Sequence, residues 1–285
     1  MSSCTSFRIG GPADLLLDLR DEAQAAAALN AASALSLPVT IIGNGTNLLV
    51  RDGGIRGVVL RMAGQTADIS VISSGSDGSA LSVPAGVTLA QLASYACMHG
   101  LDGMVPLSGI PGALGGAVIM NAGAYGGETS QIVTDVSGIR MDGTPFAYHK
   151  DEISFGYRRS SLSDEPLLVT RVSVFLPCGE TEDIRSRMND LSRQRREKQP
   201  LEYPSAGSTF KRPVGGFAAK LIDDCGLRGF SVGGAQVSEK HAGFVINRGG
   251  ATAADVLSLM KIIQKRVSDA SGILLEPEVR ILGED

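Results

Sequence analysis

The chain has 285 residues, 43% of them hydrophobic and 20% charged, which is the composition of an ordinary folded protein with room for two or three domains. Its net charge of −4 excludes a globally basic surface for nucleic acid or an anionic membrane. No stretch approaches the roughly 20 apolar residues of a membrane span. An anionic ligand would therefore need a local cationic pocket.

The four cysteines lie far apart, at positions 4, 97, 178 and 225. They form no CxxC pair and have no histidine ladder near them, so neither zinc nor a disulfide scaffold is indicated, and we expect no metal site. Free thiols suit a reducing cytoplasm. The first eleven residues lack the basic end and apolar core of a signal peptide, so we expect a cytoplasmic protein.

The first sixty residues predict a small α/β unit. The expected strands cover residues 5–19, 39–42, 48–50 and 57–62. A Gly-Gly-Pro turn interrupts the first of them, and an alanine-rich helix with an acidic start is expected at 21–35. The loop that follows strand 39–42 is expected to face a ligand.

The middle of the chain predicts further strands and two helices. The expected strands cover residues 67–72, 80–83, 136–140, 145–149 and 167–176. Asp142-Gly143 predicts a two-residue hairpin turn, 73–79 a flexible loop and 152–161 an irregular polar segment. Helices are expected at 88–99 and 181–198, and the second is acidic first and basic last, as the helix dipole prefers.

Pro200 and Pro204 break the chain, and we place a domain boundary there. Beyond them we expect a loop at 205–213, a short helix at 217–225, a strand at 244–247 and a returning strand at 274–282. The last helix begins with a capping box, Thr252 and Asp255. Its expected buried stripe consists of Val256, Leu259, Met260, Ile263 and Val267.

Two loops are rich in glycine and asparagine. The first, which we call the anchor loop, is residues 110–128, with six glycines and four alanines around Asn121. Glycine reaches positive φ freely, and a run of small residues can turn successive N–H groups toward an anion. A lone glycine pair would favour a tight turn instead. The upstream loop, residues 43–47, has the sequence Gly-Asn-Gly-Thr-Asn. Together the loops suit a long ligand with a central diphosphate, so we predict a dinucleotide site.

Six motifs follow one another along the chain: TSFRIGGPAD (5–14), GNGTNLLV (43–50), IPGALGG with NAGAYGGE (110–128), FGYRRS (155–160), AGSTFKRP (206–213) and LEPEVRIL (275–282). In this order they resemble the motifs of the UDP-N-acetylenolpyruvoylglucosamine reductases, flavin enzymes of peptidoglycan precursor synthesis. The resemblance covers nearly the whole chain. A single glycine loop is unspecific, whereas six ordered motifs are specific.

The resemblance implies an α+β fold in which FAD is held without a covalent bond between two N-terminal subdomains of the vanillyl-alcohol-oxidase (PCMH) type. A third α+β domain binds the substrate. The implied parts are residues 1–61 with the C-terminal strand 276–285, then 62–199, then 200–275. A Rossmann fold is not expected, because no GxGxxG opens a helix here.

Carried over position by position, the resemblance implies FAD contacts from the two glycine-rich loops and their borders. These residues are Gly43, Asn44, Gly45, Thr46, Asn47, Gly109, Ile110, Pro111, Gly112, Gly115, Gly116, Asn121, Ala122, Gly123, Ala124 and Tyr125.

The implied reaction has two halves. NADPH reduces the flavin, which then gives hydride to the enolpyruvyl methylene carbon of a UDP-sugar, and a proton completes the D-lactyl ether. The charge that develops beside the substrate carboxylate needs positioned cations or donors. Ser208 matches the proton donor, Glu278 an acidic partner and Arg158 the cation near the carboxylate. Since a serine is a poor acid, it needs a neighbour, and Lys211 is a candidate.

The resemblance gives moderate support to four substrate contacts, Tyr157, Lys198, Lys211 and Asn247, and little to His241. Taken alone, Ser208 would be a turn hydroxyl, Glu278 a solvated strand carboxylate, and Arg158 half of a surface pair with Arg159. Only the ordered motifs favour the catalytic interpretation.

One departure from the longer family members is informative. Those carry an insertion, after the motif that matches FGYRRS, with a substrate-capping tyrosine, but here only about 50 residues separate Arg158 from Ser208. The chain therefore resembles the shorter, type II form that lacks the tyrosine loop, and the capping of the sugar nucleotide stays open. The resemblance also implies a role in cell-wall biogenesis, cell shape and cell division. We expect a monomer.

Two other classes of function stay open. An FAD-dependent oxidase of the same superfamily would use oxygen as acceptor and would not need Ser208, Glu278 and Arg158. A non-catalytic nucleotide-binding module would be colourless and would stay so with added FAD. An absorbance spectrum followed by an anaerobic NADPH titration separates the three.

Overall fold

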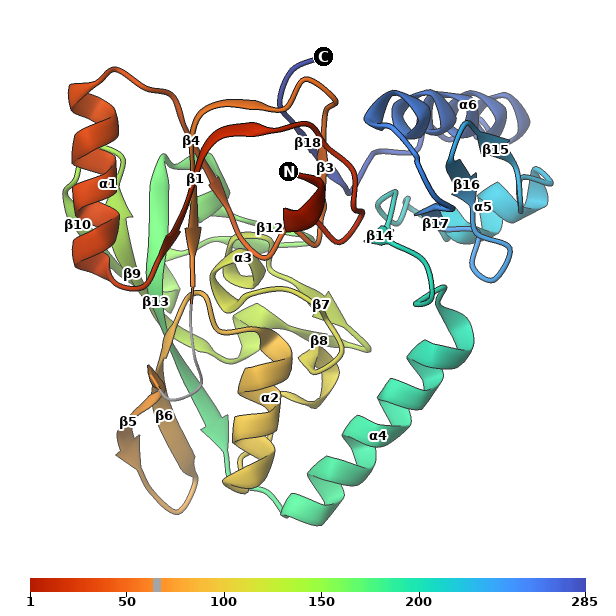
Figure 1. The fold of residues 1–285 in the computed structure, drawn as a ribbon. Helices are drawn as coiled ribbons and strands as arrows, with labels where there is room; N and C mark the ends of the chain where they lie inside the picture. Colours follow the sequence, from red (N-terminus) through yellow and green to blue (C-terminus); the bar gives the residue numbers. More distant parts are fainter. Residues whose placement is uncertain (64–67) are drawn as a thin grey trace. The chain divides into compact units, whose positions relative to one another are not determined.

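A computed structural model describes residues 1–63 and 68–285, with helices and strands mixed along the chain (Figure 1). The chain divides into two units. The first combines Met1–Leu15, Gly45–Arg56 and Arg195–Asp285, and the second combines Leu16–Asn44 and Gly57–Gln194. The expected division into three domains stays a prediction, since the first unit joins parts of the expected first domain to the expected substrate domain.

The second unit is built on an antiparallel sheet of five strands in the order β10-β9-β13-β6-β5. The strands are β5 (Ser70–Ser74), β6 (Gly78–Pro84), β9 (Val133–Arg140), β10 (Pro145–His149) and β13 (Leu167–Pro177). In the second half of β13, alternate side chains point into the core, and Val172, Val174 and Leu176 are fully buried. The expected hairpin around Asp142-Gly143 is confirmed as the β9–β10 pair, but its connection, residues 141–144, is longer than the expected two residues.

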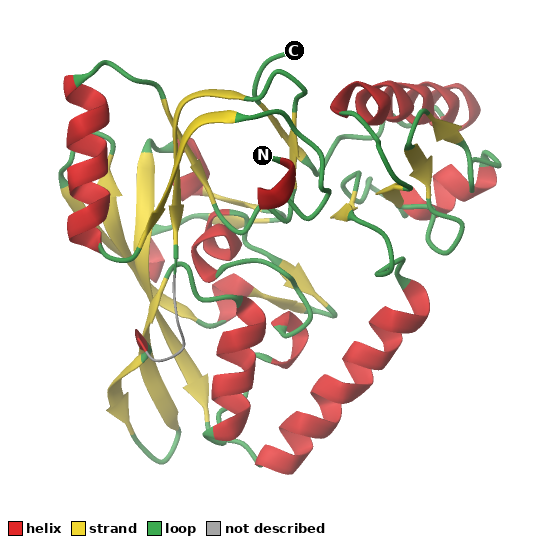
Figure 2. Cartoon of the chain, viewed as in Figure 1, coloured by secondary structure: helices red, strands yellow, loops and turns green. Residues whose placement is uncertain are grey.

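Helices complete this unit, as Figure 2 shows in red. They are α1 (Glu22–Ala34), α2 (Leu89–Met98), α3 (Leu114–Ile119) and α4 (Thr181–Lys198), the last of which continues into the first unit. The caps explain two of the starts: Asp21 accepts the N–H of Gln24, and Thr88 forms a capping box with Gln91. The three longer helices confirm the predicted ones.

Three strands form a second sheet, ordered β1-β4-β2, in which β2 runs parallel to β4. They are β1 (Ala13–Leu19), β2 (Val39–Ile42) and β4 (Ile55–Met62). Both β1 and β4 begin in the first unit and end in the second.

The first unit has a four-stranded sheet in the order β14-β17-β16-β15, with the α5 and α6 helices packed against one another. The elements are β14 (Ser205–Ser208), β15 (Ser231–Val232), β16 (Ala235–Val237), β17 (Phe244–Asn247), α5 (Ala218–Asp224) and α6 (Ala253–Ser271). The predicted stripe of α6 is buried and its capping box is present, so both predictions are confirmed. Asp52 adds a second cap, because its carboxylate accepts the N–H groups of Ala253 and Ala254.

Three short pairs of strands contain candidate site residues or lie next to them in the sequence. They are β3 (Leu48–Val50) with β18 (Arg280–Leu282), β7 (Gly123–Ala124) with β8 (Gly127–Glu128), and β11 (Phe155–Gly156) with β12 (Arg159–Ser160). The first pair is parallel and the other two are antiparallel.

Several predicted boundaries are wrong. The first strand starts only after the Gly-Gly-Pro turn, because the preceding residues bond to neighbouring loops, as Gly11 N–H does to Arg51 O. The expected loop 205–213 begins as strand β14, and the tail forms a strand only at Arg280–Leu282. The supposed flexible loop 73–79 is a tight hairpin between β5 and β6. Position 67 of the expected strand 67–72 lies outside the described residues.

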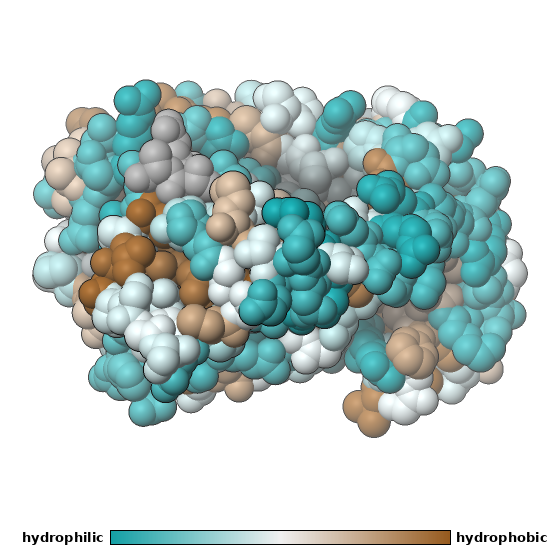
Figure 3. All heavy atoms as spheres, turned by 90° about the horizontal axis from the view of Figure 1, so that it is seen from below, coloured by the Kyte–Doolittle hydropathy of each residue, from teal (hydrophilic) through white to brown (hydrophobic). Residues whose placement is uncertain are grey.

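The surface of the second unit carries an apolar patch in the view of Figure 3. Exposed large apolar side chains of its sheet are Val71 and Ile72 on the edge strand β5 and Phe175 on β13. Among residues 1–63 and 68–285, no helix is both long and apolar enough to cross a membrane.

Candidate active site

Ser208 and Glu278 lie on adjacent segments of the first unit. Ser208 ends β14, and the next residue, Thr209, accepts a 2.9 Å hydrogen bond from the Glu278 N–H. Phe210 and Pro277 form an antiparallel bridge, so the segments 209–211 and 276–278 run side by side. Two residues separated by 70 positions are thus brought together by main-chain bonds.

The upstream loop reaches the same place. The side-chain amide of Asn47 donates to the carbonyl oxygen of Glu278 at 3.0 Å, and the carbonyl of Asn47 accepts from Arg280 N–H at 2.9 Å. β3 then continues from the loop, parallel to β18. The backbone of Glu278 is therefore held from both sides, by Thr209 and by Asn47. Ser208 itself is exposed and Glu278 is half-buried.

The N-terminal segment makes hydrogen bonds to both the strand that ends at Ser208 and the upstream loop. The Ser6 hydroxyl lies 2.7 Å from the carbonyl oxygen of Ser205 and 3.3 Å from that of Thr46. The buried side-chain amide of Asn247 donates to Phe7 O at 3.2 Å. Its oxygen accepts the N–H groups of Gly249 and Ala251. Asn247 thus supports the N-terminal segment, and its contact with substrate stays a prediction.

The predicted basic residues of this unit have different surroundings. The ammonium group of Lys211 pairs with Glu276 at 3.1 Å. Lys198 is exposed at the end of α4. His241 accepts the Gly243 N–H through Nδ1 at 3.1 Å, and burial lowers the pKa of its imidazole. This supports the interpretation of His241 as a satisfied loop histidine.

Arg158 lies in the second unit, in the two-residue turn between β11 and β12. Its φ is +55°, a conformation usually taken there by glycine or asparagine. Its guanidinium carbon lies 4.9 Å from the centre of the Tyr157 ring, which is half exposed. The neighbouring Arg159 forms an ion pair with Asp164.

The anchor loop meets the start of the upstream loop within the second unit. The Asn44 side-chain amide donates to the carbonyl oxygen of Pro111 at 3.3 Å. A Cβ added at Gly43 would lie 3.7 Å from the Cα of Gly116, and the reverse distance is 4.0 Å. The two loops that were predicted to share a ligand are neighbours through these glycines.

Other glycines of the loops are required by the fold. A Cβ on Gly45 would lie 2.0 Å from the Cys4 carbonyl oxygen, and one on Gly123 would lie 2.5 Å from the Gly127 oxygen. Gly43 and Gly116 differ, because neither has a positive φ and an added Cβ would meet only ordinary contacts. Folding does not explain why these two positions lack a side chain. A ligand lying against bare backbone does, so the residues fit a bound dinucleotide.

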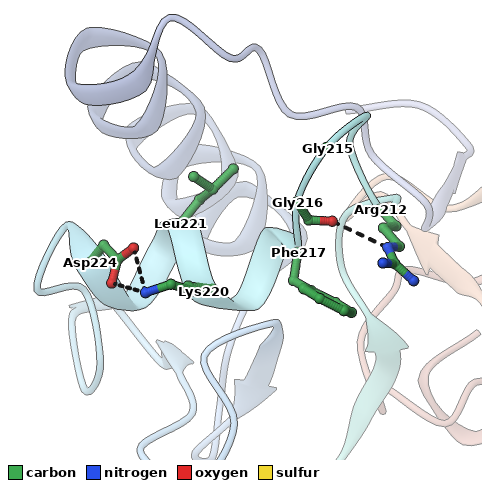
Figure 4. Close-up of a pocket in the computed structure, with 7 residues that line it drawn as sticks. All are labelled: Arg212, Gly215, Gly216, Phe217, Lys220, Leu221 and Asp224. Carbon is green, nitrogen blue, oxygen red and sulfur yellow. Dashed lines mark hydrogen bonds and ion pairs between the residues drawn. The ribbon is translucent and has the colours of Figure 1, made fainter.

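A pocket of about 320 Å³ lies in the first unit, beside the loop that follows Ser208 (Figure 4). The Arg212 guanidinium stacks on Phe217, 4.0 Å from the ring centre, and donates to Gly216 O. Lys220 and Asp224 on α5 form an ion pair at 2.9 Å on the same wall. The sequence analysis missed these residues. The signal in the sequence is the pair of apolar residues Val214 and Phe217 on either side of two glycines, and the structure exposes them to 99% and 57%.

The structure contains no candidate metal centre in the part of the chain that it describes, since no group of three or more His, Cys, Asp or Glu side chains is placed to hold an ion.

Fold and loops together define a flavoprotein class. Residues 13–146 match a family described as an FAD binding domain. The predicted α+β flavin-binding fold is confirmed, and so is FAD as the cofactor of this class.

The chain belongs to the UDP-N-acetylenolpyruvoylglucosamine reductase family. Residues 199–282 match the C-terminal domain of that family. A reductase of this name from Clostridium botulinum is 48% identical over 285 residues, which cover 100% of this chain and 91% of the relative. One from Agathobacter rectalis is 47% identical and covers 100% of this chain and 92% of the relative. The crystal structure of the Thermus caldophilus reductase matches with a TM-score of 0.82 and 36% identity, over 99% of this chain and 97% of that one.

Proposed function

We propose that this chain reduces the enolpyruvyl ether of UDP-N-acetylglucosamine to the D-lactyl ether of UDP-N-acetylmuramate, with FAD as cofactor and NADPH as reductant, in peptidoglycan precursor synthesis. Membership of the reductase family supports the reaction, and the FAD binding domain supports the cofactor. The short connection 161–166 between β12 and β13 is consistent with the form that lacks the tyrosine loop.

The observation that carries the proposal furthest is the position of Glu278. Its backbone bonds to Thr209, next to the predicted proton donor, and to Asn47, in a predicted cofactor loop. This arrangement supports a common role for three motifs that are distant in sequence.

FAD, held by the two glycine-rich loops, would supply the hydride chemistry that links NADPH to the enolpyruvyl methylene carbon. The adjacent carbon then carries enolate charge and has to receive a proton. We assign that proton to the Ser208 hydroxyl and the balancing positive charge to Arg158. Lys211 pairs with Glu276, and the exposed Ser208 is open to water, so water is the source of the replacement proton. We assign Glu278 as the acidic partner on the side of the site from which Ser208 delivers the proton.

The pocket beside Arg212 supports binding of the nucleotide part of the substrate. It offers two cationic groups, Arg212 and Lys220, for a diphosphate and one face of Phe217 for a base. The carboxylate of Asp224 lowers the net positive charge of the pocket lining. The pocket therefore suits a ligand that has neutral hydrogen-bonding groups as well as a diphosphate. We assign the uridine diphosphate to this pocket.

We also place the reaction in the cytoplasm, on a monomer. All four cysteines are free thiols, which supports a reducing compartment. Size-exclusion chromatography with light scattering should give a mass near 29.6 kDa, and a mass of twice that value would exclude the monomer.

The deciding experiment is an absorbance spectrum of the purified protein followed by anaerobic titration with NADPH. We expect an oxidised flavin spectrum that is bleached by NADPH and is restored anaerobically by the enolpyruvyl substrate. A protein that is restored only by oxygen would be an oxidase. A protein that stays colourless with added FAD would be a nucleotide-binding module.

A further inference from the structure

Asn121 is the most buried polar side chain of the anchor loop, with 1% of its surface exposed. Its Nδ2 donates to Glu128 Oε2 at 2.9 Å and to the carbonyl oxygen of Gly156 at 3.0 Å. Its Oδ1 accepts the N–H of Ser130 at 3.0 Å. Both amide hydrogens are therefore used inside the protein, and the side chain has none left for a cofactor.

One of these bonds leaves the anchor loop. Gly156 is the residue before the turn that carries Tyr157 and Arg158. On the other side of the turn, the fully buried Ser160 hydroxyl donates to Ile119 O at 2.9 Å. The β11–β12 hairpin is thus fastened on both flanks to residues 119–121.

The turn between the two fastenings has an uncommon backbone. Arg158 has a φ of +55°, and two anchor-loop residues, Asn121 at +41° and Tyr125 at +51°, also lie in the left-handed region. Such conformations cost free energy and persist only where the surroundings enforce them. Two of the contacts that hold the turn with Arg158 are the bond from Asn121 to Gly156 and the bond from Ser160 to Ile119.

We infer that Asn121 is a positioning residue for Arg158: its buried amide couples the cofactor loop to the turn that presents the arginine. The inference rests on the proposed function for the role of Arg158. It deepens that function, because it makes substrate reduction depend on a side chain whose two amide hydrogens are both donated to protein oxygens. The bond that matters is the one from Nδ2 to Gly156 O.

A paired exchange isolates that bond. In the variant Asn121→Asp/Glu128→Gln, the amide of the new glutamine can donate to the new aspartate. The hydrogen bond between positions 121 and 128 is therefore kept, with donor and acceptor exchanged. The bond to Gly156 is not restored, because a carboxylate would face a carbonyl oxygen. Asn121→Asp alone also places two carboxylates together and should lose more stability. The matched control is Thr129→Val, which removes the 2.8 Å bond from the buried hydroxyl just after the anchor loop to Ala122 O within it and leaves both bonds to the hairpin in place.

Three measurements on the holoenzyme test the inference: flavin content, the two half-reactions by anaerobic stopped flow, and hydrogen exchange of the segment 155–160. For the paired exchange we expect full flavin content, flavin reduction by NADPH close to that of the parent, and reoxidation by substrate slowed about tenfold or more. Exchange in 155–160 should increase, while Thr129→Val should change neither reoxidation nor exchange in that segment.

The last test asks whether the effects of the paired exchange and of Arg158→Gln depend on one another. Once the paired exchange has loosened the turn, Arg158→Gln should cost less than it does in the parent, because coupled residues are not additive. Loss of flavin from the paired exchange, unchanged exchange in 155–160, or fully additive effects would overturn the inference. If Arg158→Gln leaves reoxidation unchanged in the parent while the paired exchange still loosens 155–160, the assignment of Arg158 fails and the fastening by Asn121 stands.

Discussion

The two units hold their candidate residues by different means. In the first unit, Ser208 and Glu278 are positioned by main-chain bonds between adjacent segments, with the Asn47 amide as an addition. In the second unit, the turn with Arg158 is a short hairpin in a left-handed conformation that side chains fasten to the anchor loop. Hydrogen bonds between main-chain groups remain when a side chain is replaced, whereas hydrogen bonds made by that side chain are lost.

This difference decides how a substitution should be interpreted. Replacing a side chain on the serine segment removes a chemical group and leaves its neighbours in place. We expect the replacement of Asn121 or Ser160 to change the position of Arg158 instead. Effects in the first unit should therefore appear in one kinetic step, and effects in the second unit in stability and rate together.

The largest expected effect is that of Ser208→Ala. If the hydroxyl delivers the proton, reoxidation of the reduced enzyme by substrate should slow by about 10²–10⁴-fold, the usual contribution of a general acid. Flavin reduction by NADPH and the melting temperature should stay near the parent values, because main-chain bonds hold the segment. Stopped-flow absorbance resolves both halves. Equal slowing of the two half-reactions would remove Ser208 from this role.

Gly116→Val tests the bare backbone of the second unit. The Cβ of the new side chain would lie 4.0 Å from the Cα of Gly43, which is an ordinary contact, so we expect the fold to be retained. The same side chain should occupy the place of the ligand and weaken FAD binding about 100-fold, which is ~2.7 kcal/mol. Flavin fluorescence titration of the apoprotein measures this affinity. Gly75→Ala, in the β5–β6 turn with nothing near its added Cβ, is the matched control. Unchanged FAD affinity in the valine variant would contradict the assignment of the loop.

A smaller effect is expected from Phe217→Ala in the pocket of the first unit. Stacking of a base on an aromatic ring contributes about 1–3 kcal/mol, so KM for the UDP-sugar should rise about tenfold. The rate of flavin reduction by NADPH should not change, and binding of UDP by calorimetry should weaken in parallel. Leu274→Ala provides a control, since that side chain is also largely exposed. An unchanged KM would place the nucleotide elsewhere.

The smallest effect concerns pH. Burial lowers the pKa of His241 below its usual value near 6.5, so the unfolded chain binds this proton more readily than the folded one. The resulting stability is present above pH 6.5 and is lost as the pH falls below it. His241→Asn keeps an acceptor for Gly243 N–H and removes the titration. Its melting temperature should fall less between pH 7 and pH 5.5 than that of the parent. Parallel curves would exclude this contribution of His241.

Features of the fold that depend on neighbouring residues could be predicted from the sequence. Helices with caps and a clear period, such as Ala253–Ser271, and the hairpin at Asp142-Gly143 were predicted closely. The motifs also identified the family. Strand β14 was missed because Ser205–Ser208 contains a glycine and two serines, and only pairing with β17 makes it a strand. No local pattern could report that pairing.

The candidate site shows the same limit. The motifs named Asn121 and Asn247 as contacts with ligands, but their roles inside the protein depend on partners 35 and 240 positions away. The pocket with Arg212 and Phe217 was missed because a cation and an aromatic ring five positions apart form no pattern that sequence reasoning recognises. Only the folded loop stacks one on the other.

We propose above all that this protein is an FAD-dependent reductase whose electron acceptor is an enolpyruvyl sugar nucleotide. The most direct test is to reduce the holoenzyme with NADPH under anaerobic conditions and add the substrate in stoichiometric amounts. We predict that each equivalent of substrate restores one equivalent of oxidised flavin and appears as UDP-N-acetylmuramate in the product. Flavin that stays reduced with excess substrate, and is reoxidised only when oxygen is admitted, would contradict the account.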